Sequence, residues 1–167
     1  RRAVAEAMDA LGYVPSHAAR SMKSNKSDLV GLITGAISNA DEISTAAGLP
    51  DLLIVQGAQA VIERSNKTLL ISDTGGRLDR VPDLIRTFPE HRVEGILYVA
   101  DFHKPLDLTL PGRGIPKVLV NCFDAFGTPA VVPDDESGQY ALTKSVIAHG
   151  HSRIAYLTLA PGQEATR

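Results

Sequence analysis

The sequence predicts an α/β fold in which a parallel sheet is flanked by helices. Short aliphatic runs alternate along the 167 residues with segments whose apolar residues recur at helical spacing. Some of these runs are apolar at consecutive positions, which is typical of strands covered on both faces. Because ligands of such sheets bind at the carboxyl ends of the strands, the candidate site lies in four loops. These loops follow Ile33, Ser72, Val99 and Val120.

The amino-terminal part of the chain predicts two short helices and a linker. A helix is expected over 3–11 from the spacing of its apolar residues, and Gly12 ends it. Ser16 is a good N-cap for a second helix over about 16–23. The polar residues 25–27 then lead into the first strand.

Aliphatic and β-branched runs mark the expected strands, at about 29–33, 68–72, 95–99, 117–121, 130–132 and 153–159. The first helix between them has Ile54, Ala58, Val61 and Ile62 on one face. The second has Leu78, Val81, Ile85 and Phe88 on one stripe. The third opens at "DDESG" and runs to about 148, whereas 34–50 and the proline-rich 101–116 are expected to be irregular.

Charge is unevenly distributed along the chain. The net charge of −2 is divided into +3 over residues 1–27 and −5 over the remainder. A basic end on an acidic body indicates that only the end meets a polyanion such as DNA.

Composition favours a cytoplasmic protein that does not contact the membrane. No apolar run approaches the roughly 18 residues that span a bilayer, and residues 1–13 lack the pattern of a secretory signal. Cys122 is the single cysteine, so an internal disulfide is excluded.

No motif predicts catalysis, a metal or a cofactor. The sequence "DTGG" at 73–76 lacks the rest of a phosphate-binding pattern and is expected to be a tight turn. The acids of 133–138 suit the first turn of a helix better than a metal site, because no histidine accompanies them. Cys122 has no nearby base and is expected to be a buried spectator. The chain is therefore not expected to be an enzyme.

The leader before the first strand contains one apolar side chain among cations. Met22 lies between Arg20 and Lys23, and an apolar wedge between cations is what a minor-groove binder uses to kink DNA. An amphipathic turn that docks on its own domain would have the same pattern, so the residues alone leave both readings open.

The chain resembles the lactose-repressor (LacI/GalR) family of bacterial transcription regulators. The resemblance rests on ordered segments: "AMDALGYVPSHAARSMKSNKS", "VGLITGAIS", "QGAQAVIERSNKTLLISDTGG", "RVEGILYVA", "GIPKVLVNCFD" and "VVPDDESGQYALTKSVIAHGHSRIAYL". It implies a periplasmic-binding-protein-like lobe and the start of a second lobe, preceded by a hinge helix and the end of a helical DNA-binding headpiece. It also implies a homodimer that binds operator DNA and senses a small-molecule effector, a sugar or sugar derivative, without a cofactor.

The resemblance also implies roles for individual residues. Met22 falls on the position that inserts into the minor groove, where the family usually has Leu. Ala19, Arg20 and Lys23 would contact DNA or the partner hinge helix. Asn121 matches a position, often Asp, that hydrogen-bonds effector hydroxyls. The other expected effector-binding residues are Thr34, Ile37, Asp101, Phe102 and Arg167.

Four segments are expected from the resemblance. They are the last headpiece helix at 1–12, the hinge helix and linker at 13–27, the first lobe at 28–135 and the beginning of the second lobe at 136–167. The family begins earlier and continues further, so the chain is expected to be an internal fragment.

Two alternatives remain at the level of sequence. A periplasmic-type solute-binding protein would share the core fold but would have an export signal upstream, where a regulator would have a helix-turn-helix. An α/β enzyme would need a catalytic constellation that these residues do not contain.

Overall fold

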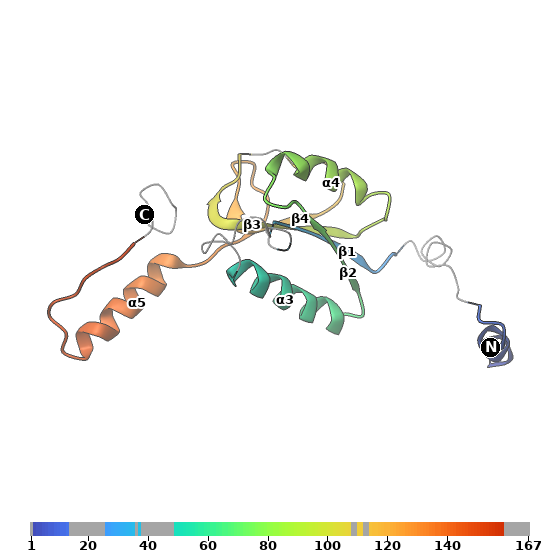
Figure 1. Cartoon of the computed structure of the whole chain (residues 1–167), viewed down its shortest axis with the longest axis horizontal. Helices are drawn as coiled ribbons and strands as arrows, with labels where there is room; N and C mark the ends of the chain where they lie inside the picture. The colour runs from blue at the N-terminus through green and yellow to red at the C-terminus, as the bar shows by residue number, and fades with distance from the viewer. Residues whose placement is uncertain are drawn as a thin grey trace.

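The computed structural model describes residues 2–13, 26–35, 37, 49–107, 110–111 and 114–158. Within these ranges the strands form one five-stranded sheet of order β2-β1-β3-β4-β5, and every neighbouring pair is parallel (Figure 1). The strands are β1 (Leu29–Thr34), β2 (Thr68–Asp73), β3 (Gly95–Pro105), β4 (Lys117–Phe123) and β5 (Ala130–Val131). The prediction of a parallel α/β sheet is confirmed.

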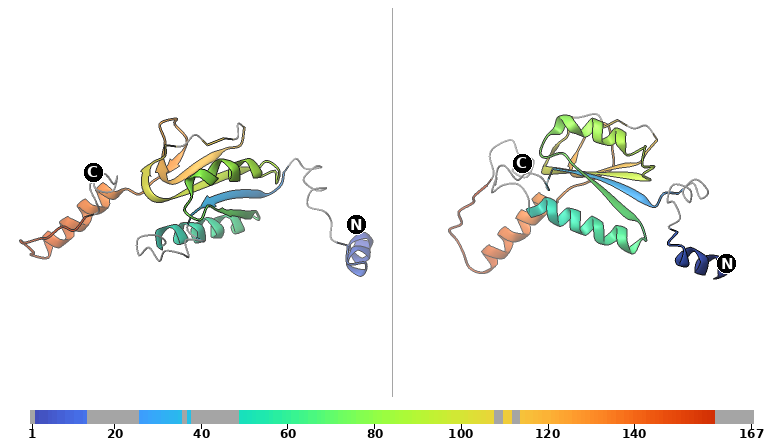
Figure 2. Two further views of the ribbon diagram at one scale, coloured as in Figure 1. Left: turned by 45° about the horizontal axis from the view of Figure 1, so that its top comes forward. Right: turned by 45° about the vertical axis from the view of Figure 1, so that its right-hand side comes forward.

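Helices cover both faces of the sheet. Helix α3 (Leu49–Arg64) lies against one face, and the 3-10 turn η1 (Leu78–Arg80) with α4 (Val81–Thr87) lies against the other (Figures 1 and 2). Successive strand residues point to opposite faces, so Leu32 of β1 packs on the α3 side and Ile33 on the α4 side. This two-sided burial explains the consecutive apolar residues of the strands.

Two residues expected on the buried helix faces are instead exposed. Val61 of α3 is 54% exposed, and Val55, which was not expected to face the core, is buried in its place. Leu78 lies in the 3-10 turn rather than in the α-helix, so its side chain is exposed and the buried stripe of α4 begins at Val81.

Strand β3 is longer than expected. Residues 101–105 continue the strand, and after an irregularity between Val99 and Lys104 the pairing with β4 resumes at Lys104↔Cys122. Leu106 then donates its backbone N–H to Phe123 O at 2.7 Å and buries its side chain. Pro105 is compatible with this arrangement because it lies at the very end of the strand. The expectation that residues 101–116 are irregular was therefore wrong for residues 101–105.

The expected strand at 153–159 is absent from the described residues 151–158. Helix α5 (Asp135–Ala148) leaves from the side of the sheet where the strands end, at the left of Figure 1, and has no buried side chain. Ile154, Tyr156 and Leu157 after it are exposed. Strand-forming residues become a strand only when a neighbouring strand accepts their hydrogen bonds, and the described residues provide none there.

The helix expected at the amino terminus is confirmed as α1 (Arg2–Ala10). Gly12 adopts a φ of 62°, and Tyr13 donates its N–H to Met8 O at 2.9 Å, which closes the last turn. The helix expected at 16–23 lies outside the described residues. In the described part of the chain, no helix is long and apolar enough to cross a membrane.

Candidate ligand site at the carboxyl ends of the strands

The candidate site lies where β1 and β2 end, beside the part of β3 that follows its pairing with β1. Thr34 ends β1 and pairs with Asp73, which ends β2. The backbone N–H of Thr74 donates to Thr34 O at 2.8 Å, which joins the two loops directly after the strands. The parallel register therefore brings together residues that are forty positions apart in sequence.

Polar atoms from the loop after β2 and from strand β3 converge around Gly35. A Cβ atom at this position would lie 2.9 Å from Asp101 Oδ1, 3.2 Å from Thr74 Oγ1 and 3.4 Å from the backbone nitrogen of Gly76. A side chain here would therefore displace the Asp101 carboxylate. Glycine at position 35 allows the carboxylate, the hydroxyl and the backbone to approach within van der Waals distance of one point.

Asp73 contributes a second carboxylate to this end of the sheet. Its Oδ1 accepts a hydrogen bond from the backbone N–H of Ile37 at 3.4 Å. Its Oδ2 is buried and, among the described residues, accepts no hydrogen bond. Burying a carboxylate oxygen without a donor is costly, so the site favours a molecule that brings an N–H or O–H group.

Asn121 shapes the neighbouring part of the edge, on β4. Its backbone has a φ of 60°, a conformation that asparagine tolerates better than most residues. Its Nδ2 donates to Ala100 O at 3.1 Å and ties β4 to β3 where their regular pairing is interrupted.

Only some of the residues that the sequence predicted for this site lie in the polar cluster. Asp101 is in the polar cluster, and Ile37 contributes its backbone N–H while its side chain is exposed. Thr34 is only 1% exposed, so its side chain belongs to the floor of the site rather than its surface. Phe102 is exposed, and its ring centroid lies 6.0 Å from Lys104 Nζ. Arg167 lies outside the described residues, as do Ala19, Arg20, Met22 and Lys23.

Three members of the cluster were not assigned from the sequence: Gly35, Asp73 and Thr74. Their position in the sequence could have indicated them, because Gly35 directly follows β1, Asp73 ends β2 and Thr74 directly follows β2. The sequence "DTGG" forms the expected tight turn, with Gly75 and Gly76 at φ of 62° and 77° and with Gly76 N–H donating to Thr74 Oγ1 at 3.2 Å.

The acidic segment 133–138 caps α5, as expected. Asp134 accepts a hydrogen bond from Ser137 N–H at 3.1 Å, and Asp135 pairs with His103 Nδ1 at 2.8 Å. Within the described ranges, no group of three or more His, Cys, Asp or Glu side chains is placed to hold a metal ion.

Neither Cys122 nor Tyr98 is prepared for nucleophilic chemistry. Burial raises the pKa of the Cys122 thiol to about 11, and the side chain is fully buried as expected. Burial also raises the pKa of Tyr98, with the nearby Cys122 and Asp101 adding to the shift. Both groups are therefore neutral at physiological pH.

Comparison with known proteins gives consistent relatives, although no family model matches the chain. The HTH-type transcriptional repressor PurR of Vibrio atlanticus (strain LGP32) is 31% identical over 158 residues, which are 93% of this chain and 45% of that protein. PurR of Aliivibrio fischeri (strain MJ11) is 30% identical over 162 residues, 95% of this chain and 45% of its own length. The chain thus spans less than half the length of these curated relatives.

Solved structures show the same fold. A transcriptional regulator of the LacI family from Rhizobium etli superposes with a TM-score of 0.70 at 31% identity, over 84% of this chain and 48% of that one. The lac repressor dimer bound to operator and the anti-inducer ONPF gives a TM-score of 0.56 at 16% identity, over 91% of this chain and 44% of that one. The curated relatives are named as repressors rather than enzymes, in agreement with the absence of a catalytic motif from the sequence.

Proposed function

We propose that the chain is a LacI-family transcriptional regulator and that it acts as an effector-responsive repressor. The proposed protein is a cytoplasmic homodimer that binds operator DNA and changes its affinity for DNA when a small molecule occupies the core. Effector and operator then bias one conformational equilibrium from two separate sites. The relatives named as repressors support this proposal, and they favour it over the solute-binding alternative.

The polar cluster at Gly35 is the single observation that carries the effector site. Thr74 directly follows β2 and Asp101 belongs to β3, and Oγ1 of the first and Oδ1 of the second lie beside Gly35, which follows the strand between them, β1. Ligands of parallel sheets bind at the carboxyl ends of the strands, which supports the proposal. Asn121, at the same edge, is proposed as a further contact to effector hydroxyls.

The chemistry of the cluster limits the effector. Asp73 and Asp101 are acceptors when ionised, and Oδ2 of Asp73 has no donor among the described residues. Two carboxylates repel an anionic effector and accept hydrogen bonds from hydroxyl groups. A neutral polyhydroxylated molecule, such as a sugar or sugar derivative, is therefore proposed.

On the DNA side, the proposed contacts come from the leader. Met22 is proposed to insert between base pairs in the minor groove, and Lys23 to neutralise a phosphate. The change Met22→Ala should weaken specific operator binding much more than non-specific binding. In contrast, Lys23→Ala should reduce the slope of log affinity against log salt by about one.

The experiment begins with selection of an operator from random double-stranded DNA by the complete native protein. A panel of sugars and nucleobases is then screened for molecules that shift both thermal unfolding and operator affinity. We expect a selected operator and at least one neutral polyol that changes its affinity. A protein that binds DNA only non-specifically would contradict the proposed function.

The effector site is tested separately with Asp101→Asn. We expect this variant to lose at least about tenfold in effector affinity while operator affinity without effector stays at the wild-type value, since one buried charged hydrogen bond is worth about 1.5–3 kcal/mol. Asp83→Asn is the matched control, because Asp83 is an exposed carboxylate on α4 that pairs only with Arg86 in the described contacts. Equal effects of the two changes would contradict the assignment of the site.

A further inference from the structure

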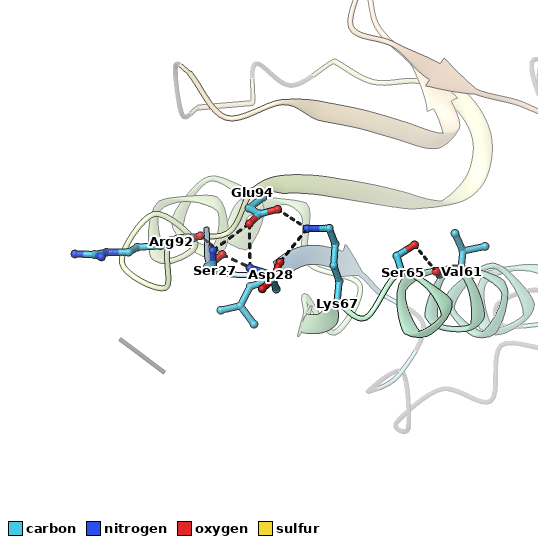
Figure 3. Close-up of polar contacts among 8 residues, drawn as sticks. Ser27, Asp28, Val61, Ser65, Lys67, Arg92 and Glu94 are labelled. Atoms are coloured by element: carbon cyan, nitrogen blue, oxygen red, sulfur yellow. Dashed lines mark hydrogen bonds and ion pairs between the residues drawn. The ribbon is translucent and has the colours of Figure 1, made fainter. Parts of the chain in front are cut away.

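A cluster of polar contacts holds the start of β1 at the end of the sheet opposite the candidate ligand site. We call it the entry clamp, and it consists of Ser27, Asp28, Lys67, Arg92 and Glu94 (Figure 3). Three of its members directly precede strands that are neighbours in the sheet: Asp28 precedes β1, Lys67 precedes β2 and Glu94 precedes β3. The clamp therefore joins the chain that enters the core to the strands on both sides of it.

Glu94 is the centre of the entry clamp. Its Oε1 accepts two backbone hydrogen bonds, from Ser27 N–H and Asp28 N–H, both at 3.0 Å. Its Oε2 binds Lys67 Nζ at 2.5 Å. The bond to Lys67 is the main reason why the pKa of Glu94 is lowered, and the same bond raises the pKa of Lys67.

Ser27 is the segment's buried anchor. Its side chain is almost completely buried, and its Oγ donates to Arg92 O at 2.5 Å and accepts from Leu29 N–H at 3.2 Å. The backbone N–H of Ser27 also donates to Glu94. The hydrogen bonds given for Ser27 therefore join it to the segment 92–94 and to the start of β1.

Backbone conformation gives an independent sign that this junction is held firmly. Asp28, Asn66 and Arg92 are not glycines, yet they have φ values of 55°, 53° and 56°. Each lies one to three residues before a strand, at the same end of the sheet. Non-glycine residues keep this conformation only where the surrounding contacts determine it, and such positions cluster at functional sites.

The entry clamp lies close in sequence to the residues proposed to contact DNA. Ser27 is only four positions after Lys23, so the Cα atoms of the two residues are at most about 14 Å apart. Whatever fixes Ser27 and Asp28 therefore limits where the residues proposed to contact DNA can lie relative to the core.

We propose that Glu94 is a positioning residue for operator binding: it fixes the point at which the leader leaves the core and thereby the placement of the DNA-contacting residues. The proposal rests on the proposed function. It concerns neither the effector site nor direct contact with DNA, since Glu94 is an acid on the core.

Two variants separate the roles of the Glu94 side chain. Glu94→Ala removes the acceptor of both backbone hydrogen bonds, and Glu94→Gln keeps an oxygen that can accept them. Asp83→Ala is the control, because it also removes an acid from an ion pair but lies on α4. Thermal unfolding first establishes that each variant is folded.

The first measurement is amide hydrogen exchange of the complete native protein. In Glu94→Ala the Ser27 and Asp28 amides should exchange at least about tenfold faster than in the wild type. The amide of Leu119 on β4, which donates to Pro129 O, should keep its rate. Unchanged exchange at Ser27 and Asp28 would overturn the clamp.

The second measurement is affinity for an operator selected from random DNA. We expect Glu94→Ala to lose about tenfold or more, Glu94→Gln to recover most of that loss, and Asp83→Ala to match the wild type. Wild-type affinity in Glu94→Ala, together with fast exchange at Ser27, would overturn the positioning role while leaving the proposed function intact. If the wild type selects no operator, the proposed function fails and the positioning role fails with it, whereas the exchange rates still decide whether the clamp exists.

Discussion

Gly31, at the centre of β1, is a glycine beside which the core has no room for a Cβ atom. A Cβ at Gly31 would lie 2.8, 2.9 and 3.0 Å from three carbons of the Phe88 ring. Phe88 is fully buried in the core cluster on the α4 side of the sheet, together with Val81 and Ile85. The ring has no exposed direction in which to move, so Gly31→Ala must shift α4 away from the sheet.

The expected cost follows from two opposing contributions. Overpacking a well-filled core destabilises a protein by typically about 1–3 kcal/mol. Replacing glycine by alanine in a strand recovers roughly 0.5–1 kcal/mol of backbone entropy. We therefore expect Gly31→Ala to lower the free energy of unfolding by about 1–2 kcal/mol, which lowers the melting temperature by roughly 2–8 °C for a chain of this size.

The assay is urea and thermal unfolding followed by circular dichroism. Gly57→Ala is the matched control, since it is the same substitution in the interior of α3 and its Cβ would meet nothing within 4 Å. That change should raise stability by roughly 0.5–1 kcal/mol. Combining Gly31→Ala with Phe88→Leu should cost at least about 0.5 kcal/mol less than the sum of the single changes, because the smaller side chain makes room for the methyl group. A Gly31→Ala variant as stable as the wild type, or strict additivity with Phe88→Leu, would refute the reasoning.

Three further predictions follow from other parts of the structure. Cys122 should react with a thiol reagent at pH 8 only as fast as the protein opens, because the thiol is buried and its pKa is about 11; reaction at the rate of free cysteine would contradict this. The native pKa of Glu94 lies below its unfolded value of 4.5. The ionised Glu94 side chain therefore contributes its full stabilisation above pH 4.5, and this stabilisation is lost as the pH falls through the lowered native pKa. Urea midpoints should depend less on pH in this acidic range for Glu94→Gln than for the wild type. Asp134→Ala removes the N-cap of α5 and should cost that helix about 0.5–2 kcal/mol, measured as faster exchange of the Ser137 amide, with Glu136→Ala as the control that keeps the cap.

The centre of the sheet was predictable because β1 and β3 carry buried residues on both faces. A strand covered on both faces has apolar residues at consecutive positions, so the apolar runs of β1 and β3 identify these strands in the sequence. The same reasoning failed at residues 153–159, where aliphatic composition alone predicted a strand. A strand depends on hydrogen bonds to a neighbour that its own residues cannot provide.

The candidate site was predictable in place but only partly in membership. The rule that ligands bind at the carboxyl ends of parallel strands indicated the loops after β1, β2 and β3. It did not indicate that Gly35 leaves room for Asp101 and Thr74 beside it, because their placement depends on the register of three strands. Thr34 likewise looked accessible in sequence and is buried in the structure.

By itself, the sequence determined the fold class, the order of most elements, the basic leader and the resemblance to the LacI family, since each depends on the order of residue types along the chain. The tertiary structure alone decided which side chains meet. Glu94 is 67 residues from Ser27 in sequence, and nothing local marks it as the acceptor of the Ser27 and Asp28 amides. Contacts of this kind arise when the parallel sheet aligns the starts of three strands, and they exist only after the chain has folded.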